Sequence, residues 1–291
     1  MQGKILSTIH EVDFYGNDKT QFLFNTDNGI YLIDVNGEPV EGFPITLTTK
    51  ITNAVSVVMN TDNDYRMFVA CENGNIYGYY KDGKPIAGWN PQKNAGQITQ
   101  PLFTIKSNKG LAIGYINNSA VLLKKENGQA LQSIPFASGF ADIYSFNSGI
   151  GLMDKKGNVI VIDSLLKVST ITAADELMYA AFTDVKNDDS LDIIFIEDDY
   201  FKASSVSGKN IFVTEVGANV SGVMNIQFKQ RNYFGYYTMD SQLYLFTEEG
   251  KLADGFPVQG SNRAVVDDIS GSGDNVLITV VGNMLLAYRI L

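Results

Sequence analysis

Residues that carry much of catalytic and metal chemistry are scarce in this sequence. Its 291 residues include one histidine (His10), one cysteine (Cys71) and one tryptophan (Trp89). A single cysteine excludes an internal disulfide and a cluster of thiolate metal ligands. Any Ser-His-Asp or Cys-His arrangement would have to use His10, and a lone histidine is more often structural than catalytic. Cys71, in "FVACENG", is predicted to be a small buried hydrophobic residue.

The sequence also has fewer basic than acidic residues and no long apolar run. There are 22 Lys and Arg against 32 Asp and Glu, a formal net charge of −10 at pH 7. Because this charge repels phosphate backbones and anionic lipid, we expect no nucleic-acid partner. No stretch approaches the roughly 18 consecutive apolar residues of a membrane span, so no transmembrane segment is expected. The hydrophobic fraction of 45% is nevertheless sufficient for a packed core.

One phrase occurs three times in the chain. "NGEPVEGFP" starts at Asn36, "DGKPIAGWN" at Asp82 and "EGKLADGFP" at Glu249. Its first glycine suits the positive-φ residue of a tight hairpin, and its closing aromatic residue and proline suit the end of an outermost strand. The phrase therefore has a sufficient structural explanation.

The phrase belongs to a longer repeat that runs through the whole sequence. Each copy has a strand rich in Ile, Leu, Val and Tyr, a glycine turn and a second strand. Successive equivalent positions are 46, 45, 39, 41, 42 and 41 residues apart, at Tyr31, Tyr77, Leu122, Val161, Lys202, Tyr244 and Leu285. Units of roughly 40 residues are typical of a β-propeller. The sequence predicts an all-β fold, a seven-bladed β-propeller of four-stranded blades, in one domain spanning residues 1–291.

Alternation of apolar residues and turn signals divides each copy into four strands. In the second copy the expected strands are residues 52–59, 65–71, 75–80 and 84–89. In the sixth copy they are 220–228, 232–239, 242–247 and 251–258. The most helix-like stretch, "AADELMYAAF" from Ala173, falls where the first strand of a blade is expected.

The last copy, "GNMLLAYRIL", stops after its third strand. Residues 3–8, "GKILST", are similar to residues 83–89, "GKPIAGW", which form the fourth strand of the second copy. We therefore expect the N-terminal strand to close the last blade and remove its open edge. A sequence that starts inside a repeat also suggests a domain excised from a longer protein.

Blades that read Gly-x-hydrophobic-Tyr, then Gly-Lys, then Gly-Trp or Gly-Phe-Pro resemble the quinoprotein-like and the FG-GAP (VCBS)-type repeat propellers of bacterial exported proteins. The resemblance implies a periplasmic or extracellular location within a longer exported protein, although Met1 leads directly into "KILSTI" with no signal peptide. Quinoprotein dehydrogenases have eight tryptophan-rich blades and, in the alcohol dehydrogenases, adjacent disulfide-bonded cysteines. With Trp89 and Cys71 alone, no cofactor is expected here.

FG-GAP repeats carry a calcium loop of the form D-x-[DN]-x-D-G-x-x-D, whose oxygens suit a hard cation. The best match is "DVKNDDSLD", with Asp184, Asp188 and Asp192 at three ligand positions. Lys186 stands where a further oxygen donor belongs, and Asp189 replaces the turn glycine. An ammonium group there could pair with the carboxylates in place of a cation. We predict a degenerate, metal-free loop, with calcium binding as the weaker alternative.

Three further segments match the calcium loop less well and are interpreted as Asx-type turns. They are "NTDNDYRMF" with Asn60, Asp62, Asp64 and a final Phe68, "DISGSGDNV" with Asp268, Ser270 and a final Val276, and "DFYGNDKTQ" with Asp13, Asn17 and a final Gln21.

Carboxylates could still support catalysis without histidine, as in many glycosidases. Five acids qualify by position at inner strands or loops, each more plausible as a turn or solvated residue: Asp142, Asp175, Glu176, Asp267 and Asp268. No GxSxG, HExxH or phosphate-binding glycine loop is present.

Loops between blades are the usual binding regions of such folds. The longest is residues 90–97, "NPQKNAGQ", which suits hydrogen bonding to a glycan or a peptide. We predict a non-catalytic binding or scaffold domain that contacts a protein or a glycan on one propeller face. A carbohydrate-binding module and a carboxylate-dependent glycan hydrolase or lyase remain as alternatives.

Overall fold

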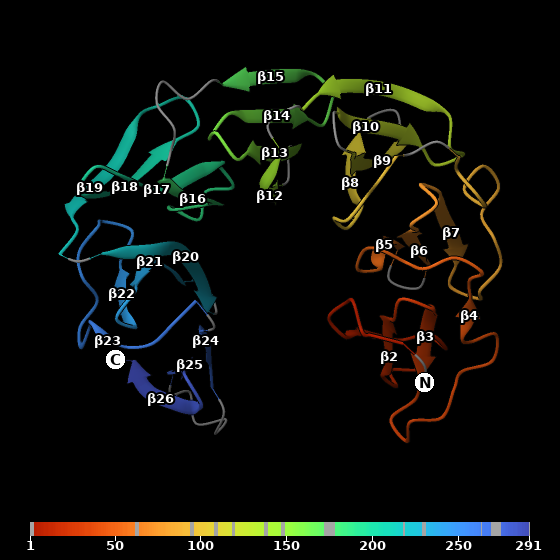
Figure 1. Ribbon diagram of the computed structural model, residues 1–291, viewed down its shortest axis with the longest axis horizontal. Helices are drawn as coiled ribbons and strands as arrows, with labels where there is room; N and C mark the ends of the chain where they lie inside the picture. The colour runs from red at the N-terminus through yellow and green to blue at the C-terminus, as the bar shows by residue number, and fades with distance from the viewer. Residues whose placement is uncertain are drawn as a thin grey trace. The chain divides into compact units, whose positions relative to one another are not determined.

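The computed structural model describes residues 3–61, 64–93, 96–107, 110–117, 120–136, 139–146, 149–171, 178–217, 219–228, 231–262, 264–268 and 275–290. Over these ranges the chain forms antiparallel β-sheets and no helix (Figure 1). None of the described residues therefore forms a helix that could cross a membrane. Contacts divide the chain into two compact units, Met1–Gly139 with Ser164–Leu166, and Phe140–Asp163 with Lys167–Leu291.

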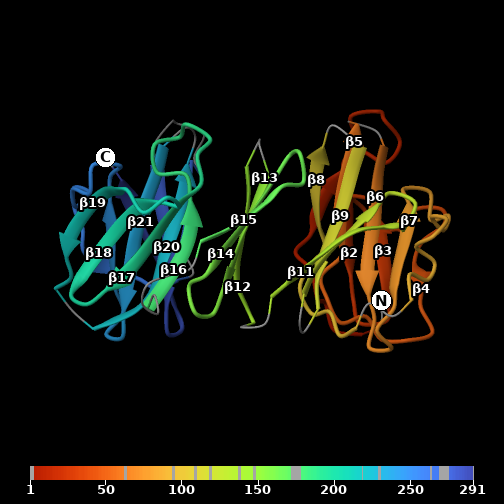
Figure 2. The same cartoon turned by 90° about the horizontal axis from the view of Figure 1, so that it is seen from above.

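The first unit holds three sheets (Figure 2). The first sheet is β1 (His10–Val12), β2 (Gln21–Asn25), β3 (Gly29–Ile33) and β4 (Ile45–Thr46). The second sheet is β5 (Ser56–Thr61), β6 (Asp64–Ala70) and β7 (Ile76–Tyr80). The third sheet is β8 (Phe103–Ser107), β9 (Gly110–Ile116), β10 (Ala120–Lys125) and β11 (Ala130–Pro135).

The second unit holds four sheets. The fourth sheet is β12 (Phe140–Phe146), β13 (Gly149–Asp154), β14 (Val159–Asp163) and β15 (Val168–Ile171). The fifth is β16 (Met178–Thr183), β17 (Asp192–Glu197), β18 (Tyr200–Ser205) and β19 (Asn210–Glu215). The sixth is β20 (Val220–Phe228), β21 (Arg231–Thr238), β22 (Gln242–Phe246) and β23 (Val258–Gln259). The seventh is β24 (Ala264–Asp267), β25 (Asn275–Val281) and β26 (Met284–Ile290).

The first three strands expected in the second and sixth copies match the observed ones to within a few residues, but the fourth do not: 251–258 shares only Val258 with β23, and 84–89 forms no named strand. The 220–228 prediction coincides with β20, and the helix-like stretch from Ala173 enters β16 at Met178, while residues 173–177 lie outside the described ranges. In the second sheet the fourth segment forms no named strand. Isolated bridges join it to the third strand, and one of them pairs Pro85 with Tyr79. An all-β architecture of seven sheets is thus confirmed, with four segments in six of them.

The repeated phrase forms hairpins, as predicted. Gly37, Gly83 and Gly250 have φ of 83°, 79° and 74°, and each backbone N–H donates to a carbonyl three residues earlier at 2.9–3.0 Å. The closing aromatic residue then packs inward. Trp89 is fully buried, its ring lies edge-on to Phe68 at 5.1 Å between centroids, and its Nε1–H donates to the carbonyl of Glu126 at 2.8 Å.

Buried polar side chains join neighbouring sheets within the first unit. Asn25 is completely buried, donates from Nδ2 to the carbonyl of Asn53 at 3.1 Å and accepts the N–H of Val55 at Oδ1 at 2.8 Å. Asn53 in turn donates to the carbonyl of Gln100 at 3.2 Å. Such bonds fix the spacing of adjacent sheets more specifically than apolar contact does, because an unsatisfied buried amide is costly.

The prediction that residues 3–8 complete the last blade is wrong. Ile5 forms a bridge with Thr26, and the Leu6 N–H donates to the carbonyl of Asn25 at 3.0 Å, so this segment pairs within the first sheet. The matching segment of the second copy is residues 49–54, "TKITNA", where Ile51 bridges Cys71 in the same way.

Side chains support this equivalence. The Asn25 N–H donates to Ser7 Oγ at 3.0 Å, and the Ala70 N–H donates to Asn53 Oδ1 at 2.8 Å. The physical reason for the error is that a Gly-Lys or Thr-Lys start followed by an apolar residue occurs both before a first strand and at a fourth strand. Sequence similarity over six residues does not separate the two.

Candidate functional site

The candidate calcium loop lies between β16 and β17 in the fifth sheet and is closed by its own backbone. Asp184 accepts the N–H groups of Asp188 at 3.1 Å and Asp189 at 2.8 Å, and Asp192 accepts the N–H of Val185 at 3.0 Å. The Ser190 N–H donates to Oδ1 of Asp188, two residues earlier, at 3.0 Å, which is an Asx turn as the sequence predicts, whereas the bonds to Asp184 and Asp192 span four to seven residues. Both carboxylate oxygens of Asp184 and Oδ2 of Asp192 therefore accept backbone hydrogen bonds.

The charges in this loop are not equivalent. Burial raises the pKa of Asp192, and the nearby carboxylates of Asp188 and Asp184 raise it further. Hydrogen bonds from Ser190 instead lower the pKa of Asp188, which is exposed.

The pairing of Lys186 with the loop carboxylates that the sequence suggests is not among the ion pairs of the described residues. Lys186 is exposed, and none of the ion pairs within 4.0 Å among the described residues includes it. The charge of Lys186 makes only a minor contribution to the lowered pKa of Asp188. Among the residues that the structure describes, no group of three His, Cys, Asp or Glu side chains is placed to hold a metal ion.

The weaker loop matches give one informative relative. Asp13 accepts the N–H groups of Gly16, Asn17 and Asp18 at 2.7–3.1 Å, so "DFYGNDKTQ" is folded in the same way as the candidate loop. Asp62 and Ser270 of the other two segments lie outside the described residues.

Cys71 and His10 show no catalytic arrangement. Cys71 is 1% exposed, and burial raises the pKa of its thiol to about 12, so it is an unreactive core residue as predicted. His10 is the first residue of β1, pairs with Leu23 and is half-buried.

Three of the five acids proposed by position lie within the described residues, Asp142 in the fourth sheet and Asp267 and Asp268 at the end of β24 in the seventh. Asp142 accepts the N–H of Phe182 at 2.8 Å and so links the fourth and fifth sheets, and burial raises its pKa. Asp267 is exposed and accepts the N–H of Asp268 at 2.7 Å. Asp175 and Glu176 lie outside the described residues.

The predicted binding loop at residues 90–97 is partly anchored. Gln92 exchanges two backbone hydrogen bonds with Ile76 at 2.8 and 3.1 Å, and Asn90 Nδ2 donates to the carbonyl of Gly78 at 3.3 Å. The beginning of this loop therefore belongs to the outer segment of the second sheet. Residues 94 and 95 lie outside the described ranges.

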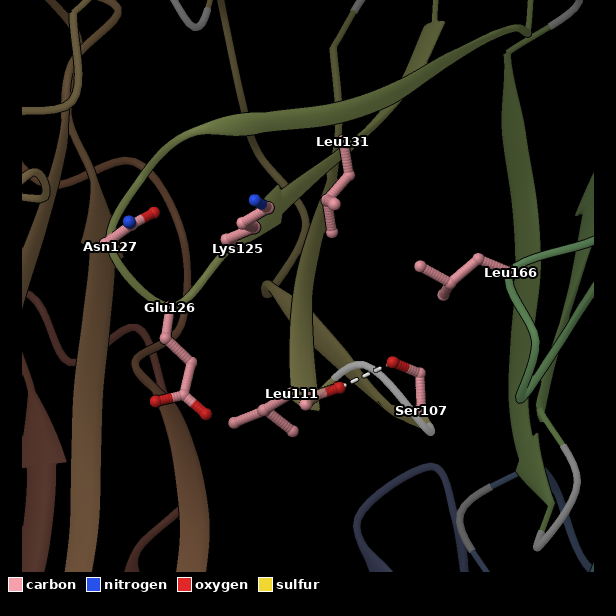
Figure 3. A pocket seen from close by; sticks show the side chains of 8 residues that line it. Ser107, Leu111, Lys125, Glu126, Asn127, Leu131 and Leu166 are labelled. Carbon is pink, nitrogen blue, oxygen red and sulfur yellow. Dashed lines mark hydrogen bonds between the residues drawn. The ribbon is translucent and has the colours of Figure 1, made fainter.

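A shallow pocket of about 370 Å³ lies in the first unit beside two hairpin turns (Figure 3). It is lined by Leu111, Leu131 and Leu166 together with Lys125 and Asn127. Ser107 Oγ donates to the carbonyl of Gly110 at 2.6 Å, as the dashed line in Figure 3 shows. Ser107 and Glu126 also line the pocket, so its wall is polar as well as apolar.

The seventh sheet differs from the others in burial. The second strands of the other sheets have consecutive buried residues, and β17, for example, is buried on both faces. In β25 only Leu277 and Thr279, which share one face, are buried. The sheet β24–β25–β26 therefore has one covered face and one open face.

We define the open face of the seventh sheet by Val265, Val276, Ile278, Val280, Leu285 and Ala287. Cross-strand pairing puts these apolar side chains together, since Val265 opposes Ile278, Ile278 opposes Ala287 and Val280 opposes Leu285. Val265 is 58% exposed and Leu285 73% exposed. Val276, Ile278 and Val280 of the central strand are half-buried, and Asp267 and Arg289 lie on the same face as Val276. Exposed apolar side chains grouped in this way mark a candidate interaction site. The repeat pattern did not single it out.

Comparisons with solved structures agree with this architecture. The structure of BBS1N in complex with ARL6DN matches with a TM-score of 0.55 and 12% identity, covering 99% of this chain and 93% of that one. BamB from Moraxella catarrhalis matches with a TM-score of 0.57 and 12% identity over 99% and 86% of the two chains. Hsv2p from Kluyveromyces lactis gives 0.56 and 9% over 99% and 98%.

These neighbours are β-propellers, so the chain has a β-propeller fold, and its seven sheets are consistent with seven blades. No family model matches the sequence, and no curated protein matches it. Identities of 9–12% show the fold alone.

Proposed function

We propose that residues 1–291 form one non-catalytic propeller domain that binds protein through the open face of the seventh sheet, within a longer exported or cell-surface bacterial protein. The single observation that carries the proposal is that contiguous apolar face, with Val265 and Leu285 mostly exposed. Interfaces are built around such buried apolar anchors with a polar rim.

Two further points support protein binding. The neighbour BBS1N was solved in complex with ARL6DN, so a propeller of similar fold holds a protein partner. Two of the acids considered for glycan hydrolysis accept internal hydrogen bonds, Asp142 from Phe182 and Asp267 from Asp268. Export rests on the resemblance to bacterial exported propellers, and BamB from Moraxella catarrhalis is a bacterial neighbour compatible with it.

Site-specific photo-crosslinking in the source cells tests this function. A photoreactive residue at Leu285 or at Val265 is expected to trap the same polypeptide, to be identified by mass spectrometry and then bound again in purified form. Val35 is the matched control, because it is 68% exposed but lies in the first unit. Equal trapping at all three positions would remove the assignment to this face.

A thermal-melt screen with polysaccharide fragments separates protein from glycan binding. Ligand at about 100 times its Kd adds roughly 2.7 kcal/mol to stability, which is easily seen as a higher Tm. A shift with one sugar class, together with no protein adduct at Leu285 or Val265, would favour the carbohydrate-binding alternative instead.

A further inference from the structure

The turn from Asp163 to Lys167 differs from the other hairpins that join a third strand to a fourth segment. In each of the first six sheets, the residue that opens this turn donates its N–H to the carbonyl four residues later, as Tyr80 does to Lys84 at 2.8 Å and Asp163 does to Lys167 at 3.1 Å. In five of these turns the residue before the last is a glycine with φ of 74–86°: Gly37, Gly83, Gly128, Gly208 and Gly250. In the turn that opens at Asp163 this residue is Leu166, with φ of 62°.

Leucine is poorly suited to this backbone conformation, because its Cβ comes too close to a backbone carbonyl oxygen when φ is positive. Strained residues of this kind persist only where the surrounding structure holds them, and they are concentrated at functional sites. The Leu166 side chain lines the pocket of about 370 Å³ in the first unit, to which Ser164–Leu166 belong. The strained residue and the pocket therefore coincide.

The repeat explains why a pocket is open at this place. In the second sheet, Arg66 pairs with Tyr80, the first residue of the turn, and its guanidinium carbon lies 5.8 Å from the centroid of the Tyr80 ring. In the third sheet, the first residue of the turn is Lys125, and its pairing partner is Ala112. Alanine leaves open the space that the Arg66 side chain fills in the second copy, and Lys125 and Leu166 line the pocket there.

Leu131 is partly exposed at a position that is buried in other copies. Three residues after the turn glycine, the first, second and sixth copies have Val40, Ile86 and Ala253, and each is at most 8% exposed. Leu131 holds this position in the third copy, is half-buried and lines the pocket. Figure 3 shows the side chains of Leu131 and Leu166 pointing into the same space. The pocket thus has an apolar wall that its own chain covers only in part.

The polar part of the pocket favours a negatively charged group. It includes Lys125, Glu126 and Asn127. Arg66 binds the Glu126 carboxylate at 2.7 Å, and Figure 3 shows this carboxylate directed away from Leu166. Lys125 is exposed and takes part in none of the ion pairs within 4.0 Å among the described residues. Its ammonium group and the amide of Asn127 are therefore placed to donate to an anion.

We propose that this pocket binds a small apolar carboxylate, of about the size of octanoate. The alkyl chain lies against Leu111, Leu131 and Leu166, and the carboxylate accepts hydrogen bonds from Lys125 and Asn127. A volume of about 370 Å³ lies within the range of small-molecule sites. Leu166 extends the apolar wall in a way that the glycine of the other turns cannot. The described residues that line this site belong to the first unit, whereas the open face of the seventh sheet belongs to the second.

Titration of leucine-labelled protein with octanoate, followed by NMR of the leucine methyl groups, is the first test. Saturable shifts of the Leu131 and Leu166 signals are expected, with a Kd of about 1 mM for so small a ligand. Octanol lacks the charge and acetate lacks the alkyl chain, so each should bind at least about tenfold more weakly. Equal affinity for octanol would reject a carboxylate ligand. Absence of shifts at about 10 mM octanoate overturns the inference.

Leu166→Gly separates a ligand-binding role of this residue from a structural one. Glycine relieves the backbone strain and so offsets the lost apolar contacts, and Tm should stay within about 2 °C. Octanoate affinity should fall at least about fivefold, because part of the apolar wall is removed. Leu165→Ala is the matched control, since Leu165 is 61% exposed in the same turn and does not line the pocket. A fall in Tm with unchanged affinity would make Leu166 a packing residue and overturn the inference.

Lys125→Met keeps the length of the side chain and removes its charge. Octanoate affinity should fall at least about fivefold, and its decrease with rising salt should disappear. Lys124→Met is the matched control, because neighbouring residues of β10 point to opposite faces of the sheet. Octanoate binding that survives both Leu166→Gly and Lys125→Met would place the ligand elsewhere and reject this site.

Discussion

Gln21 in the first sheet and Asp192 in the fifth accept equivalent hydrogen bonds. Each is the first residue of the second strand of its sheet, and each takes the N–H of the residue that follows the leading aspartate of its loop, Phe14 at 2.7 Å and Val185 at 3.0 Å. Both are at most 3% exposed. A neutral amide thus does in one copy what a carboxylate with a raised pKa does in the other.

This relationship predicts that Asp192→Gln stabilises the protein at neutral pH. Folding raises the pKa of Asp192 above 3.8. The ionised carboxylate therefore lowers the free energy of unfolding at pH values above the raised pKa, and this destabilisation disappears below the pKa of the unfolded state. Replacement should raise Tm at pH 7 by about 2 °C, and the gain should shrink as the pH falls toward about 4. Calorimetry at both pH values measures it.

Asp188→Asn is the control with the opposite sign. Hydrogen bonds from Ser190 lower the pKa of Asp188, so its ionised form contributes stability that is lost as the pH falls through that lowered pKa. The substitution should therefore lower Tm slightly at pH 7. If both variants shift Tm in the same direction, the assigned charge effects are incorrect.

Calcium is expected to leave the protein unchanged. Asp184 and Asp192 already accept backbone N–H groups, and the charge of Lys186 lies close to Asp188. Melts in millimolar calcium and in EDTA should coincide, with Asp184→Asn showing the same lack of response. A calcium-dependent rise in Tm that Asp184→Asn abolishes would show a working metal loop.

Asn25→Ala is expected to be strongly destabilising. It removes both bonds across the first and second sheets and leaves the carbonyl of Asn53 and the N–H of Val55 without this partner. Buried unsatisfied groups cost about 1–3 kcal/mol each, so a loss of about 3 kcal/mol is expected from chemical denaturation. Asn36→Ala in an exposed turn is the control and should cost well under half as much.

Two glycines with the same backbone angle should respond differently to alanine. Gly37 and Gly88 both have φ of 83°, so each Gly→Ala change carries a backbone cost of about 1–2 kcal/mol. A Cβ at Gly37 meets nothing within 4 Å, whereas at Gly88 it would lie 2.0 Å from the carbonyl oxygen of Asn127. Gly88→Ala should therefore cost clearly more in urea denaturation, and equal costs would argue against this contact.

Deleting residues 1–8 should weaken the first sheet. The deletion removes Ile5, which forms a bridge with Thr26, and the Ser7 hydroxyl that accepts the N–H of Asn25. Hydrogen exchange is expected to quicken at Asn25 and Asp27. Faster exchange confined to β26 would instead support closure of the last blade by the N-terminal strand.

How far the sequence predicts this structure depends on how local the signal is. The β20 boundaries and the Gly83 hairpin follow from alternation and turn chemistry, which are local. The partner of residues 3–8 depends on which strand they meet, and a short apolar segment is compatible with several. Burial of β25 on one face only could not be read from its sequence, because a strand covered on both faces and this one are equally apolar.

Trp89 gives the protein a built-in optical reporter. It is the sole tryptophan, it is fully buried, and its contacts to Phe68 and Glu126 lie in the first unit. Its emission will therefore follow the unfolding of that unit, while circular dichroism sums the strands of both. Coincident transitions by the two signals would mean that the two units melt cooperatively, and separate transitions would reveal two steps within one chain.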